Sequence, residues 1–186
     1  MIFNKHFNLE GKHAFLGPSK YHWVNYSDEK LDRVYRLAMA AKKGSDLHEF
    51  AFHAIRLGVK LPRTSKTLNL YVNDAIGFRM TPEQVLYYSE NAFGTADAIS
   101  FRKGLLRIHD LKTGVTPSSE RQLEVYAALF CLEYGTKPAE IEIELRLYQN
   151  DEVRIFAADP DVITHVMDKI ITFDRRIQQL KIEVEG

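Results

Sequence analysis

The sequence has a single cysteine, Cys131, among its 186 residues. One thiol cannot form a disulfide within the chain, which excludes the disulfide-stapled class of small secreted proteins and fits a reducing compartment. No run of about 18 consecutive apolar residues is present, so we expect neither a membrane span nor a membrane partner. The segment from Met1 to His6 also lacks the apolar core of a signal peptide. These absences predict a cytoplasmic location, in a bacterium or in a phage-infected host.

The chain has no net charge, because 25 Lys and Arg residues balance 25 Asp and Glu residues. Proteins that bind nucleic acids commonly carry an excess of positive charge, so this balance counts against such a partner. The objection is weaker for a metal site, where acidic ligands and bound cations change the local charge. The sequence also has no Gly-x-x-x-x-Gly-Lys-Ser/Thr phosphate loop, which excludes an ATP-driven motor of that type.

Hydrophobic periodicity predicts an α/β protein. With 45% hydrophobic and 27% charged residues, the chain is long enough for one domain over residues 1–186 with a sizeable core. Ser45, Ser118 or Ser119, and Asp159 are the expected N-caps. The order of elements predicts a sheet with helices on both faces. We expect helices at 31–43, 45–56, 68–76, 118–130 and 161–181, and strands at 85–89, 93–101, 105–111, 141–147 and 153–156.

Two aspartates lie on the hairpin formed by the strands at 93–101 and 105–111. The turn between the strands contains Gly104, a residue that such connections favour. Asp97 and Asp110 should therefore sit on adjacent strands, close enough to share an ion. Mg²⁺ takes oxygen ligands and uses one or two carboxylates together with substrate phosphate. The hairpin thus predicts a Mg²⁺ or Mn²⁺ site.

Asp110 and Lys112 are two residues apart, so on a strand both side chains project from one face. The lysine would lie beside the metal, where it can orient or deprotonate an attacking water. Leu111, between them, should point into the core, and its backbone carbonyl is a further candidate metal ligand. The alternative is that Asp-x-Lys is an ordinary surface pair at a strand edge. The buried strand that leads into Asp110 favours the functional interpretation.

The first turn of the predicted helix at 45–56 contains His48 and Glu49. Neighbouring residues are about 100° apart around a helix, so the two side chains are not equally good ligands. His48 is the first candidate, and Glu49 is its replacement if His48 turns away. The alternative for a histidine at a helix start is a cap or a surface residue.

Taken together, these motifs resemble those of the PD-(D/E)XK nuclease superfamily. They are most similar to its RecB-like exonuclease branch, which includes CRISPR adaptation nucleases and phage recombination exonucleases. The resemblance covers residues 44–130. The motifs that carry it, in order along the chain, are Gly-x-x-x-His48-Glu49, Gly94-Thr-Ala-Asp97, Asp110-Leu-Lys112-Thr-Gly114 and Gln122-x-x-x-Tyr126.

The resemblance implies a restriction-endonuclease-like core, a central mixed sheet flanked by helices on both faces. It assigns metal binding to His48, Asp97 and Asp110, and catalysis to the two aspartates with Lys112. Gln122 and Tyr126 match the family's Gln-x-x-x-Tyr, which orients the site and the DNA. Several relatives carry an iron-sulfur cluster held by four cysteines, and a chain with one cysteine cannot form that cluster.

Candidate DNA contacts are the basic residues of the hairpin and one N-terminal aromatic residue. They are Arg102, Lys103, Arg107 and Trp23. Each basic residue has the alternative of a solvated surface charge. Trp23 belongs to an aromatic segment that could stack an unpaired base or form a small core. Residues 1–30 as a whole are the segment expected to face the substrate.

The sequence therefore predicts a metal-dependent deoxyribonuclease, an exonuclease of phage or bacterial recombination or repair. DNA is the expected partner, with a second copy of the chain and a recombination or helicase protein as further candidates. Two alternatives remain. One is a catalytically silent DNA-binding or assembly subunit of the same fold. The other is a structure-specific or site-specific endonuclease.

Overall fold

The computed structural model describes Phe7 and residues 14–185. The chain divides into two compact units, residues 1–43 and 44–186. The motif core predicted at 44–130 lies entirely within the second unit, and the segment 1–30 lies within the first. Among the helices of the described residues, none combines the length and the apolar character needed to cross a membrane.

The first unit contains a 3-10 helix, Pro18–Asn25, which the sequence did not predict, and the beginning of α1, Asp28–Leu57. Proline opens the short helix, where its missing N–H leaves no hydrogen bond unmade. Trp23 is half-buried, and its indole N–H donates to the carbonyl oxygen of Gly17 at 3.1 Å. Part of its surface is therefore used for packing within this unit.

Helix α1 is continuous from Asp28 to Leu57, so the prediction of two helices separated at Gly44 was wrong, and Ser45 is not an N-cap. A glycine followed by serine resembles a helix boundary by propensity alone. The structure shows another reason for the glycine. A Cβ atom at Gly44 would lie 2.8 Å from Oγ1 of Thr113, in the segment that follows the third strand. Gly44 allows this close approach inside a helix.

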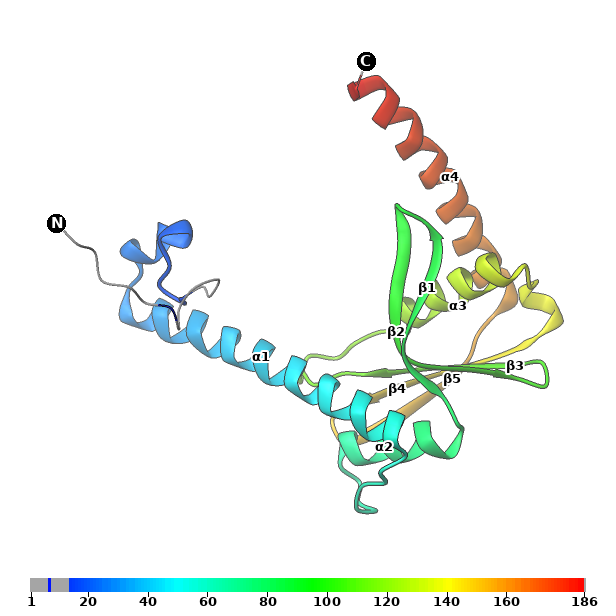
Figure 1. Cartoon of the computed structure of the whole chain (residues 1–186), viewed down its shortest axis with the longest axis horizontal. Coiled ribbons are helices and arrows are strands. Elements are labelled where there is room, and N and C mark those ends of the chain that lie inside the picture. Colours follow the sequence, from blue (N-terminus) through cyan, green and yellow to red (C-terminus); the bar gives the residue numbers. More distant parts are fainter. Residues whose placement is uncertain (1–6, 8–13, 186) are drawn as a thin grey trace. The chain divides into compact units, whose positions relative to one another are not determined.

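The second unit is built on a five-stranded mixed sheet flanked by helices (Figure 1). The order in space equals the order in sequence, β1-β2-β3-β4-β5, and β3 and β4 alone are parallel. The expected α/β sheet and its order of elements are confirmed. The strands are β1 Thr81–Ser89, β2 Ala92–Arg102, β3 Leu105–Leu111, β4 Glu142–Gln149 and β5 Glu152–Ala157.

Strand β1 begins at Thr81, four residues before the predicted strand at 85–89. Pro82, which lies before the predicted strand, pairs with Ala98 inside β1. An edge strand tolerates proline because one side of its backbone needs no partner. This extension matters, because it includes Glu83 in the sheet.

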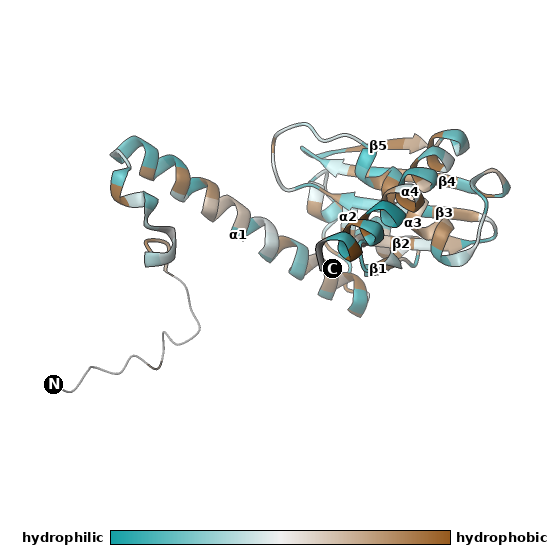
Figure 2. Cartoon of the chain, turned by 90° about the horizontal axis from the view of Figure 1, so that it is seen from above, coloured by the Kyte–Doolittle hydropathy of each residue, from teal (hydrophilic) through white to brown (hydrophobic). Residues whose placement is uncertain are grey.

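Two hydrophobic clusters cover the two faces of the sheet. One cluster packs α3, Arg121–Tyr134, and α4, Pro160–Glu185, against the strands, with Ile99 and Ile108 at its centre. The other packs the end of α1 and α2, Thr67–Gly77, against residues that include Ala98 and Leu111. Alternate residues of a strand point to opposite faces, which produces this division. Figure 2 shows hydrophobic residues interspersed with hydrophilic ones on the strands and helices of this unit.

Two helix starts differ in how they are capped. Asp159 accepts a hydrogen bond from the backbone N–H of Asp161 at 2.9 Å, so the predicted cap of α4 is confirmed. Helix α3 follows Glu120 without a side-chain cap, so the prediction of Ser118 or Ser119 was wrong. The backbone N–H of Ser118 donates instead to the Gln149 side chain at 3.1 Å. Tertiary contacts, not a local cap, hold the segment before α3.

Candidate metal centre

Asp97 and Asp110 lie side by side on β2 and β3, as the hairpin predicted. The antiparallel register pairs Ala98 with His109, and its next step sets Asp97 opposite Asp110. The backbone N–H of Leu111 donates to Oδ2 of Asp97 at 2.7 Å. Both carboxylates are largely withdrawn from water, with Asp110 2% exposed and the Asp97 side chain 15% exposed.

Lys112 and Asp110 share a face at the end of β3. The lysine Nζ lies 3.0 Å from Oδ2 and 3.1 Å from Oδ1 of the aspartate. Leu111, between them, is buried in the cluster formed by α1 and α2, as predicted. The role of its carbonyl oxygen as a ligand remains a prediction.

Gln122 and Tyr126 extend this polar chain onto α3. The Gln122 side-chain oxygen accepts a hydrogen bond from Lys112 Nζ at 2.7 Å, and its amide nitrogen donates to the Tyr126 hydroxyl at 3.0 Å. The expected common face of the two residues is confirmed. The ring of Tyr126 in turn lies against Gly94 of β2, where a Cβ atom would be 3.1 Å from Cε1.

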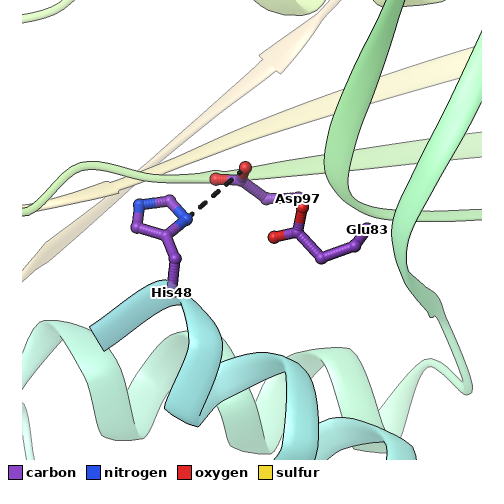
Figure 3. Close-up of side chains that lie close together, drawn as sticks. All are labelled: His48, Glu83 and Asp97. Atoms are coloured by element: carbon purple, nitrogen blue, oxygen red, sulfur yellow. Dashed lines mark ion pairs between the residues drawn. The ribbon is translucent and has the colours of Figure 1, made fainter. Parts of the chain in front are cut away.

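His48 reaches the carboxylates from α1, whereas Glu49 does not. Figure 3 shows the imidazole directed at Asp97, and Nδ1 lies 3.6 Å from Oδ1 of that residue. Glu49 is exposed and does not belong to this cluster. The two neighbouring side chains thus separate around the helix, with His48 facing the site.

Glu83 is a further acidic group at the site, and its place there was not predicted from the sequence. One ligand atom from each of His48, Glu83 and Asp97 lies within 4.8 Å of the other two (Figure 3). The register of β1 and β2 sets Glu83 opposite Asp97. The strand was predicted to begin two residues later, so Glu83 was left outside it. Extending the alternation of Val85 and Tyr87 backwards would have included Glu83 in the strand, but would not have predicted its left-handed backbone.

The backbone of Glu83 is unusual, because its φ angle is +49°. This left-handed conformation costs an L-residue roughly 1–2 kcal/mol. Five described residues other than glycine have positive φ. The other four, Arg79, Lys103, Asn150 and Asp151, follow a helix or lie in turns between strands. Strain of this kind inside a strand is typical of functional sites.

The carboxylates repel one another. Burial, followed by the charge of Asp110, raises the pKa of Asp97 to about 6. Burial also raises the pKa of Asp110, although the Lys112 ammonium opposes the rise. Burial raises the pKa of Glu83 as well. These shifts indicate more negative charge than the protein's own cations neutralise at neutral pH.

His109, next to Asp110 in the chain, does not supply the missing positive charge. It is fully buried, and burial together with the charge of Arg146 lowers its pKa to about 3. Its Nδ1 lies 3.2 Å from the Tyr148 hydroxyl, which donates to Asp74 at 2.8 Å. His109 is therefore a neutral core residue at pH 7.

The donor set fits a divalent cation. Oδ2 of Asp110 is buried without a hydrogen-bond partner, although it lies within ion-pair distance of Lys112. Carboxylate oxygens suit Mg²⁺ and Mn²⁺, and one imidazole favours Mn²⁺ over Mg²⁺. A cation bound among these groups would compensate for the burial of their charges and, at Asp97, for the repulsion from Asp110.

The predicted DNA contacts of the hairpin, Arg102, Lys103 and Arg107, do not join the cluster of carboxylates. Arg102 and Lys103 lie at the turn before β3, and about 17 Å of strand separates Leu105 from Asp110. Arg107 is held by Glu144 at 2.8 Å and stacks over the Phe78 ring. Trp23 belongs to the first unit. A role of these four side chains in binding DNA remains a prediction.

Comparisons with protein-family models, with curated proteins and with solved structures found no match to this chain. The functional interpretation therefore depends on the geometry of the site and on its motifs.

Proposed function

We propose that this chain is a metal-dependent deoxyribonuclease of the PD-(D/E)XK type, with a restriction-endonuclease-like core. The observation that carries the proposal is the meeting of Asp97, in the middle of β2, with Asp110 and Lys112 at the end of β3. Surface pairs of the Asp-x-Lys type are exposed, whereas Asp110 is 2% exposed. Buried charges of this kind are retained where they bind or react.

His48, Glu83, Asp97 and Asp110 would hold Mg²⁺ or Mn²⁺. When bound, the cation supplies Lewis acidity at the scissile phosphate and lowers the pKa of water. Mn²⁺ should bind more tightly than Mg²⁺ because of the imidazole ligand. No iron-sulfur cluster is expected in this chain, which has one cysteine.

Lys112 is the group best placed to orient the attacking water and to contact a phosphate oxygen. Gln122 fixes its ammonium by the 2.7 Å hydrogen bond, and Tyr126 fixes Gln122. A lysine held at two points loses little further conformational freedom when the substrate binds, which favours the reaction by preorganisation. Gln122 and Tyr126 are thus positioning residues for Lys112.

An exonuclease in phage or bacterial recombination or repair is the activity that this site supports best. Its substrate would be DNA, and its processivity would come from a second copy of the chain or from a helicase or recombination partner. A site-specific endonuclease needs an element that reads base sequence. Outside residues 44–130, the described chain contains the 3-10 helix, the part of α1 before Gly44, β4, β5 and α4, and none of the motifs assigns such a role to them.

The test is digestion of end-labelled linear duplex, circular duplex and single-stranded DNA with Mg²⁺, Mn²⁺ or EDTA. Asp110→Asn removes one charge without changing the size of the side chain. We expect it to abolish metal-dependent digestion of linear DNA. Asp168→Asn is the matched control, because Asp168 is exposed on α4.

Three outcomes separate the alternatives. Digestion of linear but not circular DNA supports an exonuclease, and cutting of both supports an endonuclease. Binding of DNA without digestion by the wild type, with either metal, indicates the silent subunit. Digestion that survives Asp110→Asn would contradict the assigned site.

A further inference from the structure

Two exposed aromatic side chains form a pair on the hairpin of β1 and β2. Tyr87 and Phe93 are direct cross-strand partners, with ring centroids 6.4 Å apart and ring planes inclined by 29°. They are 47% and 62% exposed, and neither belongs to either hydrophobic cluster. Single exposed hydrophobic residues are common. The stacked pair and a third exposed hydrophobic side chain, Val85, together form a surface patch.

The opposite side of the hairpin is firmly anchored. Leu86 and Ala96 are buried in the cluster with α3. The backbone N–H of Tyr87 donates to the Glu133 carboxylate at 2.8 Å. At the tip, Asp174 of α4 accepts hydrogen bonds from Ser89 at 2.6 Å and from Asn91 at 2.8 Å. The backbone that carries the two rings is therefore preorganised, which lowers the entropic cost of binding a ligand on them.

Phe93 of the ring pair lies on the same strand, β2, as Asp97 of the candidate metal centre. Along β2, Phe93 and Thr95 are exposed and Asp97 follows them, while Gly94 and Ala96 between them face α3. Four residues of strand span about 14 Å. Nucleotides in duplex DNA rise by about 3.4 Å each, so a strand that keeps this spacing covers the span with about four nucleotides. Figure 1 shows the hairpin of β1 and β2 extending away from the other strands.

We propose that Tyr87 and Phe93 are a stacking platform for unpaired bases of the DNA strand that enters the metal centre. This inference rests on the proposed nuclease function and gives its substrate class, single-stranded DNA or a single-stranded end. Aromatic rings accept any base, so the platform would bind without sequence preference. Lys112 and the cation would contact the phosphates of the same strand.

The size of the patch favours bases over a protein partner. An aromatic side chain has roughly 200 Å² of surface, so the exposed parts of Tyr87, Phe93 and Val85 amount to roughly 300 Å². A stable protein interface needs about 800 Å² on each partner. Two neighbouring rings match one or two bases far better than they match a folded surface.

The first experiment measures binding alone. A fluorescein-labelled oligothymidylate of about 12 nucleotides, a length within the usual site sizes, is titrated with protein in Ca²⁺ and followed by anisotropy. Phe93→Ala and Tyr87→Ala should each weaken binding by about 5- to 100-fold, the range for one stacked base. Phe93→Trp should bind as tightly as the wild type. Ile155→Ala, at an equally exposed site on β5, is the control and should have no effect.

Phe93→Leu separates stacking from general hydrophobic contact, because it keeps apolar surface and loses the ring. Wild-type affinity in this variant, or in Phe93→Ala, would overturn the proposal. A shift from dimer to monomer in Phe93→Ala by sedimentation would also overturn it, because a second copy would then be the occupant.

The second experiment locates the platform relative to the scissile phosphate. Single-stranded substrates carry one abasic site at successive positions, and KM is measured for the wild type and for Phe93→Ala. Loss of the base about four nucleotides from the cut should raise KM in the wild type but not further in the variant. Equal effects in both proteins would contradict stacking on Phe93.

Failure of the platform and failure of the nuclease are distinguishable. If digestion depends on Asp110 while Phe93→Ala binds oligothymidylate normally, the platform is wrong and the nuclease stands. If no DNA is digested but oligothymidylate binding depends on Phe93, the nuclease is wrong and the stacking surface stands.

Discussion

The ring of Tyr126 lies against the backbone of Gly94, and a Cβ atom there would be 3.1 Å from Cε1 of the ring. This contact joins two motifs that are separate in the sequence, Gly-x-x-Asp on β2 and Gln-x-x-x-Tyr on α3. Tyr126 bonds to Gln122, which bonds to Lys112. The absence of a side chain at Gly94 therefore helps to set the position of the lysine.

Gly94→Ala should reduce nuclease activity by about tenfold or more, because the added methyl group displaces Tyr126 and with it Gln122. Overpacking of this kind also lowers the free energy of unfolding by about 1–3 kcal/mol. Gly114→Ala is the matched control, since a Cβ atom there meets nothing within 4 Å. Steady-state kinetics and urea unfolding measure both effects. Similar activity in the two variants would show that the Tyr126 contact does not position Lys112.

The role of Glu83 can be tested with variants that remove its charge and differ in backbone strain. Glu83→Ala and Glu83→Gly both remove the carboxylate, so both should weaken Mn²⁺ binding by tenfold or more, measured by calorimetry. They should differ in stability, because the left-handed φ of +49° strains alanine but not glycine.

We expect Glu83→Gly to be more stable than Glu83→Ala by about 1 kcal/mol, the reverse of the usual order inside a strand. Glu83→Gln, which keeps the strain and removes the charge, is the third member of the series. Equal Mn²⁺ affinity in wild type and Glu83→Gln would exclude Glu83 as a ligand.

Parts of this site were predictable because they depend on local geometry. Hairpin register places Asp97 beside Asp110, and helical periodicity puts Gln122 and Tyr126 on one face. Glu83 was not predictable in the same way. The direction of its side chain depends on a left-handed backbone conformation that L-amino acids avoid. The residue type does not indicate that conformation.

The basic residues illustrate the limit of charge patterns. Arg102 and Lys103 are close to the aspartates in sequence, but a strand of seven residues sends them to the other end of β3. The helix boundary predicted at Gly44 was wrong for a different reason. The glycine allows the close approach of Thr113, which is distant in sequence. The length of a strand decided the first outcome, and a tertiary contact decided the second.

The Gly44 contact predicts a double-mutant effect. In the wild-type background, Gly44→Ala should destabilise the protein by about 1–3 kcal/mol, because its Cβ would lie 2.8 Å from Oγ1 of Thr113. In a Thr113→Ala background that oxygen is absent. The same change should then stabilise α1 by up to about 1 kcal/mol, the helix propensity of alanine over glycine. Urea unfolding of the four proteins measures the coupling, and equal effects in both backgrounds would show that the contact is unimportant.

The raised pKa of Asp97 predicts the pH dependence of stability. A carboxylate whose pKa rises from 3.8 to about 6 on folding binds its proton more tightly in the folded state. Its contribution therefore favours folding fully below pH 3.8 and is lost as the pH rises through about 6. Asparagine does not ionise, so Asp97→Asn removes this loss of stability at high pH. In metal-free buffer the variant should become more stable than the wild type by about 3 kcal/mol at pH 8, and by little at pH 4.

Thermal unfolding of both proteins from pH 4 to pH 8, with EDTA and with Mn²⁺, tests this expectation. Mn²⁺ should reverse the order at pH 8, because it binds and stabilises only the folded wild type. Asp151→Asn is a control of opposite sign. Lys66 lowers the pKa of Asp151, so its contribution is present above pH 3.8 and is lost as the pH falls. A stability of Asp97→Asn that tracks the wild type at every pH in EDTA would show that Asp97 is not under electrostatic stress, and would remove the main physical argument for a cation at this site.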